Sequence, residues 1–186
     1  MKNTCRAGWI SVLILALLIP IAGCGGGDDD STVSTRSPEE REEALQAQRE
    51  RIEGFGLEAT GSEAKLAEST LTGYLTARAN GEWKKACSYE VKSLRQLFGR
   101  MTQAQKGEDK PKSKGCPGYM EMATRKLTAA ERENLAEVKV KSVRVEDGQG
   151  YILYTNSAGD EYAMSIKREG GQWKVTGDLG TALTAQ

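Results

Sequence analysis

Hydrophobic residues recur at steps of three and four over residues 60–105, a spacing that predicts amphipathic helices. The first helix starts with a capping box, Thr60 to Glu63, and ends at Asn80-Gly81. A short helix over 82–89 and another over 93–105 continue the pattern. A polar loop at 106–118 separates them from two further helical stretches, the second of which starts with a capping box at Thr128.

From residue 136 onward the hydrophobic period changes to two, which predicts strands. Two valine pairs, 138/140 and 143/145, fall on opposite parities, so one strand keeps both pairs on one face only through a bulge near 141–142. Asp147-Gly148 and Gly170-Gly171 are hairpin turn signals. The sequence therefore predicts an α+β fold in which N-terminal helices pack on a curved four-stranded antiparallel sheet.

The N-terminal residues follow a different pattern. Lys2 and Arg6 precede an apolar run over residues 9–22, which is shorter than the roughly 20 residues of a membrane span. A cationic start followed by a short apolar core is the layout of a secretory signal peptide. We expect this signal peptide to occupy residues 1–23.

The end of that run, Ile21-Ala22-Gly23-Cys24, resembles the lipobox of bacterial lipoproteins. The resemblance implies acylation of Cys24, with palmitate or a related chain, and cleavage just before it. Localisation in the cell envelope follows, with the chain anchored by lipid on the extracytoplasmic face of a bacterial membrane. The alternatives are an ordinary secretory signal with an incidental cysteine, and a short buried helix.

Three segments follow the expected cleavage point. Residues 24–36 are rich in Gly, Asp, Ser and Thr, which predicts a flexible tether. Residues 37–56 begin with a capping box, Ser37 to Glu40, and carry few apolar positions, as in a charged stalk or a loosely docked helix. The α+β domain is expected over 60–180.

Composition narrows the range of functions. The chain has 26 basic and 26 acidic residues and no histidine. Loss of Lys2 and Arg6 with the signal would leave a net charge of −2, which gives no general argument for nucleic acid. The absence of histidine removes the commonest general base and the usual metal ligand. An enzyme would have to rely on Asp, Glu, Tyr, Lys or Ser, and we assign no catalytic residue, metal or cofactor.

The chain has four cysteines. Cys5 would leave with the signal and Cys24 would carry lipid, so Cys87 and Cys116 remain. An even pair in an oxidising compartment predicts a disulfide. The alternative is two unpaired buried thiols.

Helices followed by a meander that ends on Gly-Gly-Gln-Trp-Lys-Val resemble the nuclear-transport-factor-2-like cone fold. Residues 74–87 are similar to the first helices of its secreted bacterial members, and Trp173-Lys174-Val175 to their last strand. The resemblance implies an apolar pocket between helices and sheet. Its candidate lining residues are Leu71, Tyr74, Leu75, Leu97, Phe98, Tyr162, Met164 and Trp173.

Two functional hypotheses remain. The first is a non-enzymatic, membrane-anchored lipoprotein whose domain binds a small apolar ligand or an envelope protein. The alternative is an isomerase or lyase of the same fold that uses a buried Asp or Glu with a Tyr, and it requires an acid of raised pKa inside a cavity. The acids nearest the strand tyrosines, Asp147 and Asp160, lie at expected turns and are more simply turn formers.

Overall fold

The computed structural model describes residues 37–178 and 180–183, apart from residues 106 and 108–110. The expectations for the signal peptide, the lipobox and the tether fall on residues outside this part. No helix within the described residues combines the length and the apolar character that a membrane span requires.

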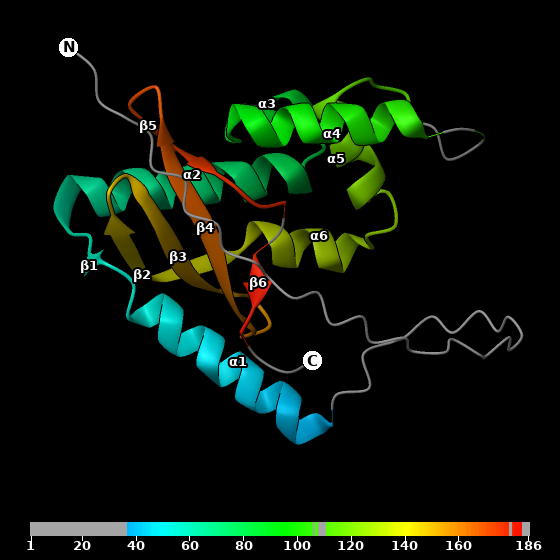
Figure 1. Ribbon diagram of the computed structural model, residues 1–186. Helices are drawn as coiled ribbons and strands as arrows, with labels where there is room; N and C mark the ends of the chain where they lie inside the picture. The colour runs from blue at the N-terminus through cyan, green and yellow to red at the C-terminus, as the bar shows by residue number, and fades with distance from the viewer. Residues whose placement is uncertain (1–36, 106, 108–110, 179, 184–186) are drawn as a thin grey trace, which may run out of the picture. The chain divides into compact units, whose positions relative to one another are not determined.

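Six helices and six strands make up the described chain (Figure 1). The helices are α1 Pro38–Glu53, α2 Gly61–Ala79, α3 Trp83–Ser88, α4 Lys92–Ala104, α5 Cys116–Thr124 and α6 Ala129–Ala136. The strands are β1 Leu57–Glu58, β2 Val138–Glu146, β3 Gln149–Asn156, β4 Glu161–Glu169, β5 Gln172–Val175 and β6 Thr181–Ala182. The predicted α+β class is confirmed.

All strand pairs are antiparallel, in the order β1-β2-β3-β4-β5, and β6 also pairs with β4. The prediction of four strands is wrong, because β1 and β6 extend the sheet to six. Each of these strands has only two residues, too few to show an alternating pattern in the sequence. They join the sheet through backbone pairing with edges that longer strands already provide.

The predicted bulge in β2 is confirmed. The register between β2 and β3 shifts between Val140 and Ser142. As a result Val143 is buried in the main core, and the valines at 138, 140 and 145 pack against that core. The bulge adds one extra residue to β2, so the valines before it and those after it face the same side of the sheet.

The sheet has a hydrophobic cluster on each face. The main core joins Leu71 and Leu75 of α2 to Ile152, Met164 and others on the strands. On the opposite face of the sheet, a small cluster contains Leu153, Ala163 and Leu183 together with Ile52 of α1. The sheet therefore lies between α1 and the remaining helices, as Figure 1 shows.

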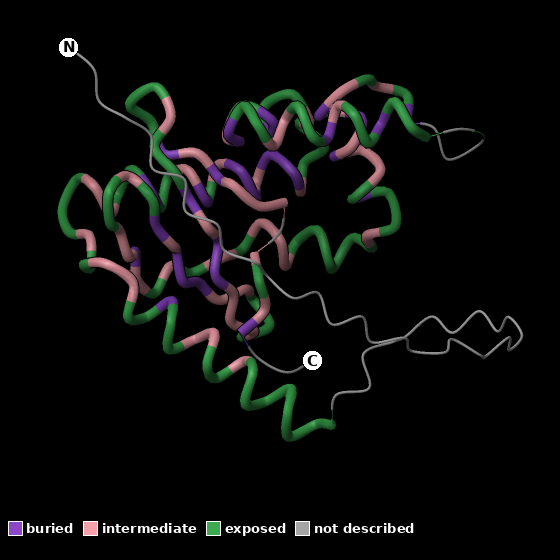
Figure 2. Tube along the Cα trace, in the orientation of Figure 1, coloured by how far each residue is buried: buried purple, intermediate pink, exposed green. Residues whose placement is uncertain are grey.

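Helix α1 is held on its face by few contacts. Ile52 is its one buried residue, and Figure 2 shows the rest of the helix mostly exposed. Arg49 adds polar contacts, because it pairs with Glu161 and donates to the carbonyl oxygen of Leu183 at 3.3 Å. The charged helix is thus docked at its C-terminal half.

The capping boxes at Ser37 and Thr128 are confirmed, with both side-chain bonds present in each. The one predicted at Thr60 is wrong, since its side chain makes no cap hydrogen bond. Glu63, its expected partner, accepts instead from Arg168 of β4 at 3.0 Å. A charged donor from the sheet replaces the local backbone donor.

Candidate functional site

The predicted pocket residues mostly fill the interior. Leu71, Tyr74, Leu75, Phe98, Met164 and Trp173 are all buried in the main core. Tyr162 is half-buried and stacks on Tyr154, with ring centroids 5.5 Å apart. Leu97 differs from the expectation, because 42% of its surface is exposed on α4.

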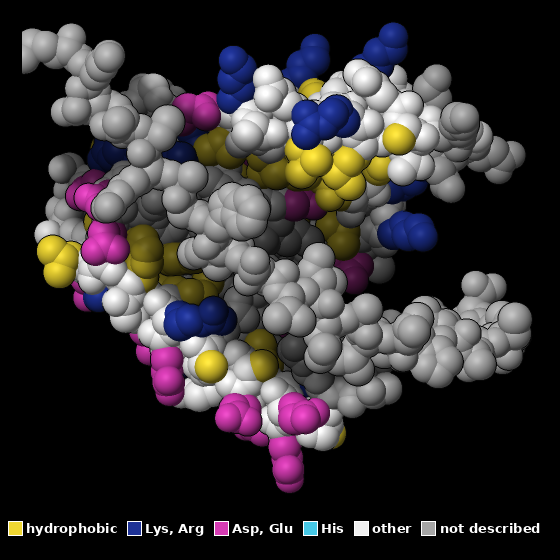
Figure 3. All heavy atoms as spheres, viewed as in Figure 1, with side chains coloured by type: hydrophobic (Ala, Val, Ile, Leu, Met, Phe, Trp, Pro, Cys, Tyr) yellow, Lys and Arg dark blue, Asp and Glu magenta, His cyan; other side chains and the backbone are white. Residues whose placement is uncertain are grey.

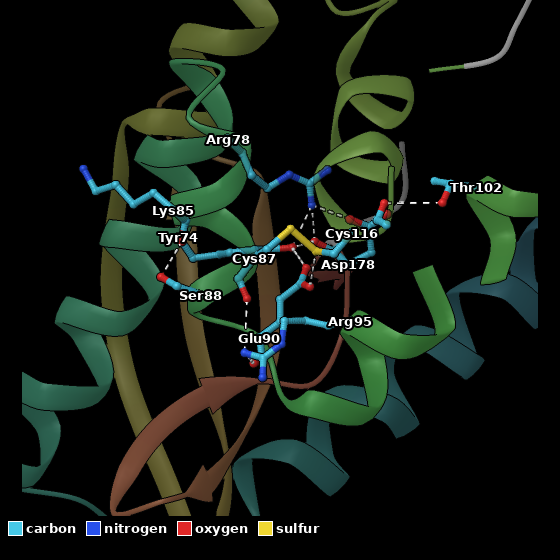
Figure 4. The surroundings of a disulfide bond; sticks show 11 residues. Tyr74, Arg78, Lys85, Cys87, Ser88, Glu90, Arg95, Thr102, Cys116 and Asp178 are labelled. Atoms are coloured by element: carbon cyan, nitrogen blue, oxygen red, sulfur yellow. Dashed lines mark hydrogen bonds and ion pairs between the residues drawn. A yellow bond between two sulfur atoms is a disulfide. The ribbon is translucent and has the colours of Figure 1, made fainter. Parts of the chain in front are cut away.

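A cluster of buried and half-buried polar groups lies against this core, and we call it the polar cluster (Figure 4). One of its members, Glu90, contacts the disulfide, and the members come from four separate segments. Tyr74 and Arg78 lie one turn apart on α2, and Tyr119 lies on α5. Glu90 follows α3, and Asp178 follows β5.

The predicted disulfide is confirmed. Cys87 and Cys116 are bonded, with Cα atoms 6.1 Å apart, and both are buried. Cys87 lies near the end of α3 and Cys116 begins α5. The bond therefore fastens α5 to α3 directly beside the polar groups.

Asp178 receives hydrogen bonds from three side chains. Arg78, which is 1% exposed, pairs through Nη1 with the Asp178 carboxylate and also with its carbonyl oxygen. The hydroxyl of Tyr74 donates to that carbonyl oxygen at 2.6 Å. The hydroxyl of Tyr119 donates to Asp178 Oδ2 at 2.8 Å. The segment after β5 is thus fastened to α2 and α5.

The two tyrosines act in this cluster as neutral donors. Burial raises the pKa of Tyr74 far above its ordinary value of 10.0. Burial, followed by the hydrogen bond to Asp178, raises the pKa of Tyr119 to about 12. Both phenols therefore keep their protons throughout the physiological range.

Glu90 is fully buried, and its carboxyl group has two polar neighbours. Oε1 lies 3.3 Å from the Tyr74 hydroxyl oxygen, and Oε2 lies 3.0 Å from Cys116 Sγ. The single Tyr74 proton goes to the much closer Asp178 carbonyl, and a disulfide sulfur carries no proton. The hydrogen at these contacts must therefore come from Glu90 itself.

The electrostatics lead to the same conclusion. Burial raises the pKa of Glu90 from its ordinary value of 4.5 to about 8. The charge of Asp178 adds to this rise, and the charges of Arg78 and Arg95 oppose it without cancelling it. Glu90 is therefore mainly protonated at neutral pH, and it donates to Tyr74 or to sulfur.

Backbone pairing fixes the position of this acid. Val175 of β5 donates to the carbonyl oxygen of Tyr89 at 2.8 Å and accepts from the amide of Val91 at 3.1 Å. Residues 89–91 are thus attached to the edge of β5, and Arg95 donates to the carbonyl oxygen of Glu90 at 3.0 Å. The side chain of Glu90 is directed into the polar cluster (Figure 4).

Cys87, Glu90 and Cys116 also have the spacing of a metal site, since their ligand atoms lie within 4.8 Å of one another. Metal binding by cysteine requires thiolates. The two sulfurs are bonded to each other here, so neither offers one. While the disulfide is closed, this trio holds a proton rather than a metal ion.

The sequence pointed to Tyr74 and the two cysteines but not to Arg78, Glu90, Tyr119 or Asp178. Arg78 carried a signal, because it lies seven residues after Leu71 and so continues the apolar stripe of α2. A cation on a core stripe requires a buried partner. Glu90 and Asp178 lie outside helices and strands with an amphipathic pattern, and nothing local distinguishes them.

We expect Asp178→Asn to lower the free energy of unfolding by about 2–3 kcal/mol, because it leaves the Arg78 cation buried without its counter-charge. The value lies below the range for fully buried pairs because Asp178 is 24% exposed. Asp147→Asn is the matched control: Asp147 lies at a hairpin turn with φ of 48°, which Asn tolerates. Urea unfolding of both variants is the measurement, and equal stabilities would contradict the role given to Asp178.

Comparison with known protein families, with curated proteins and with solved structures finds no match. The fold and the site therefore define the class by themselves. This is an α+β domain with an open antiparallel sheet and a polar cluster that contacts a disulfide.

Proposed function

We propose that this chain is a lipid-anchored lipoprotein of the bacterial cell envelope, attached by Cys24 to the extracytoplasmic face of a membrane. The observation that carries the proposal is the closed disulfide between Cys87 and Cys116. Structural disulfides persist in exported proteins and are rare in the cytosol. Export agrees with the signal-peptide layout of residues 1–23 and with the lipobox pattern that ends at Cys24.

We further propose that the domain is a cone of the nuclear-transport-factor-2-like type, and that it binds an envelope protein through its outer surface. The burial of six of the eight candidate pocket residues favours a protein partner over a small apolar ligand. The polar cluster supports this choice, because its groups bond to one another and hold segments of the chain together. Binding then depends on exposed side chains.

Glu90 meets one requirement of the enzymatic alternative, since it is an acid of raised pKa beside a tyrosine. Its two oxygens are occupied by contacts with Tyr74 and Cys116. Four depressions on the described surface are lined by other residues. Catalysis requires contact between the acid and a substrate, so these contacts favour a structural role for Glu90.

The anchor is tested by expressing the full chain in a bacterium and partitioning it between a detergent phase and water. We expect the chain in the detergent phase, and a mass at its N-terminal cysteine that includes acyl chains. Cys24→Ser is the matched control and should carry no acyl mass, because it lacks the thiol that the lipid would modify. An unmodified N-terminus on the wild-type chain would overturn the proposal.

A further inference from the structure

Charge is unevenly distributed over the described domain. Residues 37–58, which contain α1, carry seven acidic and three basic residues. The described residues of 82–126, which contain α3, α4 and α5, carry nine basic and three acidic residues. Figure 3 shows acidic side chains over α1, and Lys and Arg side chains over the region of α3 and α4. One end of a nearly neutral protein is therefore strongly basic.

Apolar side chains are exposed at the same end. Leu97 and Met101 lie one turn apart on α4, and each is 42% exposed. Figure 3 shows hydrophobic side chains gathered along α4 next to basic ones. Arg100 is exposed in the same turn of the helix. An apolar stripe beside cations is the pattern of helices that lie in a membrane interface.

The packing of α4 explains why this stripe stays outside. Phe98 stacks on Tyr119 of α5, with ring centroids 3.8 Å apart and planes 6° from parallel. Phe98 and Thr102 are the two buried residues of α4, so the helix turns that side inward. Leu97 and Met101 are covered less, and each keeps 42% of its surface exposed. The disulfide fixes α5, and thereby the orientation of α4, in place.

A shallow depression adds an aromatic ring to this end. It has a volume of about 690 Å³ and lies between α3 and the start of α5. Trp83, Lys84, Lys85 and Lys114 are among its lining residues. Tryptophan is enriched at the level of lipid headgroups, where its ring is partly wet and partly apolar. Lys85 is paired with Glu82, another lining residue, at 2.7 Å, so Lys84 and Lys114 are the lysines of this depression that suit the phosphates of those headgroups.

We propose that the α4 side of the domain docks on an anionic lipid bilayer, with Leu97 and Met101 at the acyl boundary and Arg100 and Lys114 at the headgroups. Two independent observations favour this occupant over others. The positive charge matches an anionic surface, and the exposed apolar stripe matches an interface that has an apolar side. A purely charged polymer would provide no apolar surface against which Leu97 and Met101 could be buried.

The proposal deepens the proposed function, since a lipid on Cys24 would hold the domain next to a bilayer. Thirteen residue steps separate Cys24 from Ser37, and a chain of that length reaches at most about 45 Å. A domain of this size is about 40 Å across. The chain before α1 is therefore long enough for α4 to face the bilayer. The charged residues of α1 would then face away from it.

The test uses the chain from residue 24 onward with Cys24→Ser, so that no acyl chain contributes and failure of the anchor is measured separately. Vesicles of phosphatidylcholine, with or without phosphatidylglycerol, are sedimented with the protein. We expect binding to the anionic vesicles, weak binding to the neutral ones, and a decrease as salt rises. Absence of binding to anionic vesicles at low salt would overturn the docking proposal and leave the anchor untouched.

Two pairs of variants separate the apolar and charged contributions. Leu97→Ser with Met101→Ser should reduce partitioning about tenfold. Its matched control is Leu57→Ser with Leu66→Ser, which alters two leucines that are 78% and 57% exposed on β1 and α2. Arg100→Gln with Lys114→Gln should reduce partitioning about thirtyfold. Lys139→Gln with Lys167→Gln is its control on the sheet.

The outcomes distinguish lipid from other anions. One contrary outcome is that the Leu97 and Met101 variant binds the vesicles as tightly as the parent, and that soluble polyphosphate displaces both proteins from them. The site would then recognise polyanions, and the lipid proposal would be wrong. If the control pairs weaken binding as much as the α4 pairs do, binding is not located at this face and the proposal is also wrong. Circular dichroism spectra equal to the parent's establish that each variant is folded.

Discussion

Glu90→Gln should make the protein more stable than the wild type above pH 8 and remove most of the loss of stability that the wild type shows as pH rises. The physical reason is the difference in proton binding between the folded and unfolded states. The unfolded chain releases the Glu90 proton near pH 4.5, whereas the folded chain keeps it until about pH 8. Between these values the folded state binds more protons, so stability falls as pH rises.

The size of the effect follows from the shift. At 1.36 kcal/mol per pKa unit, Glu90 should lower the free energy of unfolding by about 3–5 kcal/mol between pH 4.5 and pH 8. Below pH 4.5 Glu90 is protonated in both the folded and the unfolded state, so it no longer makes the free energy of unfolding depend on pH. Glutamine keeps the shape and a donor but cannot ionise, so the variant should lack this slope.

The measurement is urea unfolding of both proteins at several pH values from 4 to 9, within the approximations of a two-state analysis. Glu146→Gln, an exposed acid at the end of β2, is the matched control and should follow the wild type. Parallel curves for Glu90→Gln and the wild type would show that Glu90 ionises in the fold as it does in the unfolded chain. In that case the protonated state assigned to it would be wrong.

Replacing both Cys87 and Cys116 by alanine should lower the free energy of unfolding by about 3–4 kcal/mol. The bond joins residues separated by 29 positions, and on the chain-entropy model a loop of that length accounts for this loss. For a domain of this size the melting temperature should fall by about 7–14 °C. The variant also loses the sulfur beside Glu90, which leaves that acid with Tyr74 as its polar neighbour.

Thermal and urea unfolding of the chain from residue 24, in a Cys24→Ser background, measure this effect. A reducing agent should destabilise the parent to a similar extent and leave the double alanine variant unchanged, which is the internal control. A double variant as stable as its parent would show that the disulfide does not carry this part of the stability.

Local patterns were sufficient for much of the fold. The period of two predicted β2, β3 and β4, and the parity change within β2 predicted its bulge between Val140 and Ser142. Such features depend on residues close in the chain, where alternation and turn residues act directly. The strands β1 and β6 were missed because two residues form no pattern. Their pairing depends on an edge built elsewhere in the chain.

The residues of the candidate site also divide into those that the sequence predicted and those that it did not. The cysteine count, together with the expected signal peptide and the lipobox resemblance, made Cys87 and Cys116 the natural pair. The neighbours of that pair were not predictable, since Tyr74, Glu90 and Asp178 are far apart in sequence and meet only where α2, the edge of β5 and the segment after it converge. Proximity between distant residues depends on the packing of whole elements.

The sequence by itself determined the α+β class, the bulged strand, the pairing of the cysteines and the expectation of an anchor at Cys24, because each depends on local order or on counting. Only the tertiary structure decided that a buried acid lies against the disulfide, that Arg78 is neutralised by Asp178, and that α4 leaves Leu97 and Met101 exposed. The physical reason is desolvation. The protonation of Glu90 and the exposure of an apolar side chain depend on what surrounds each group in space, which neighbours along the chain do not determine.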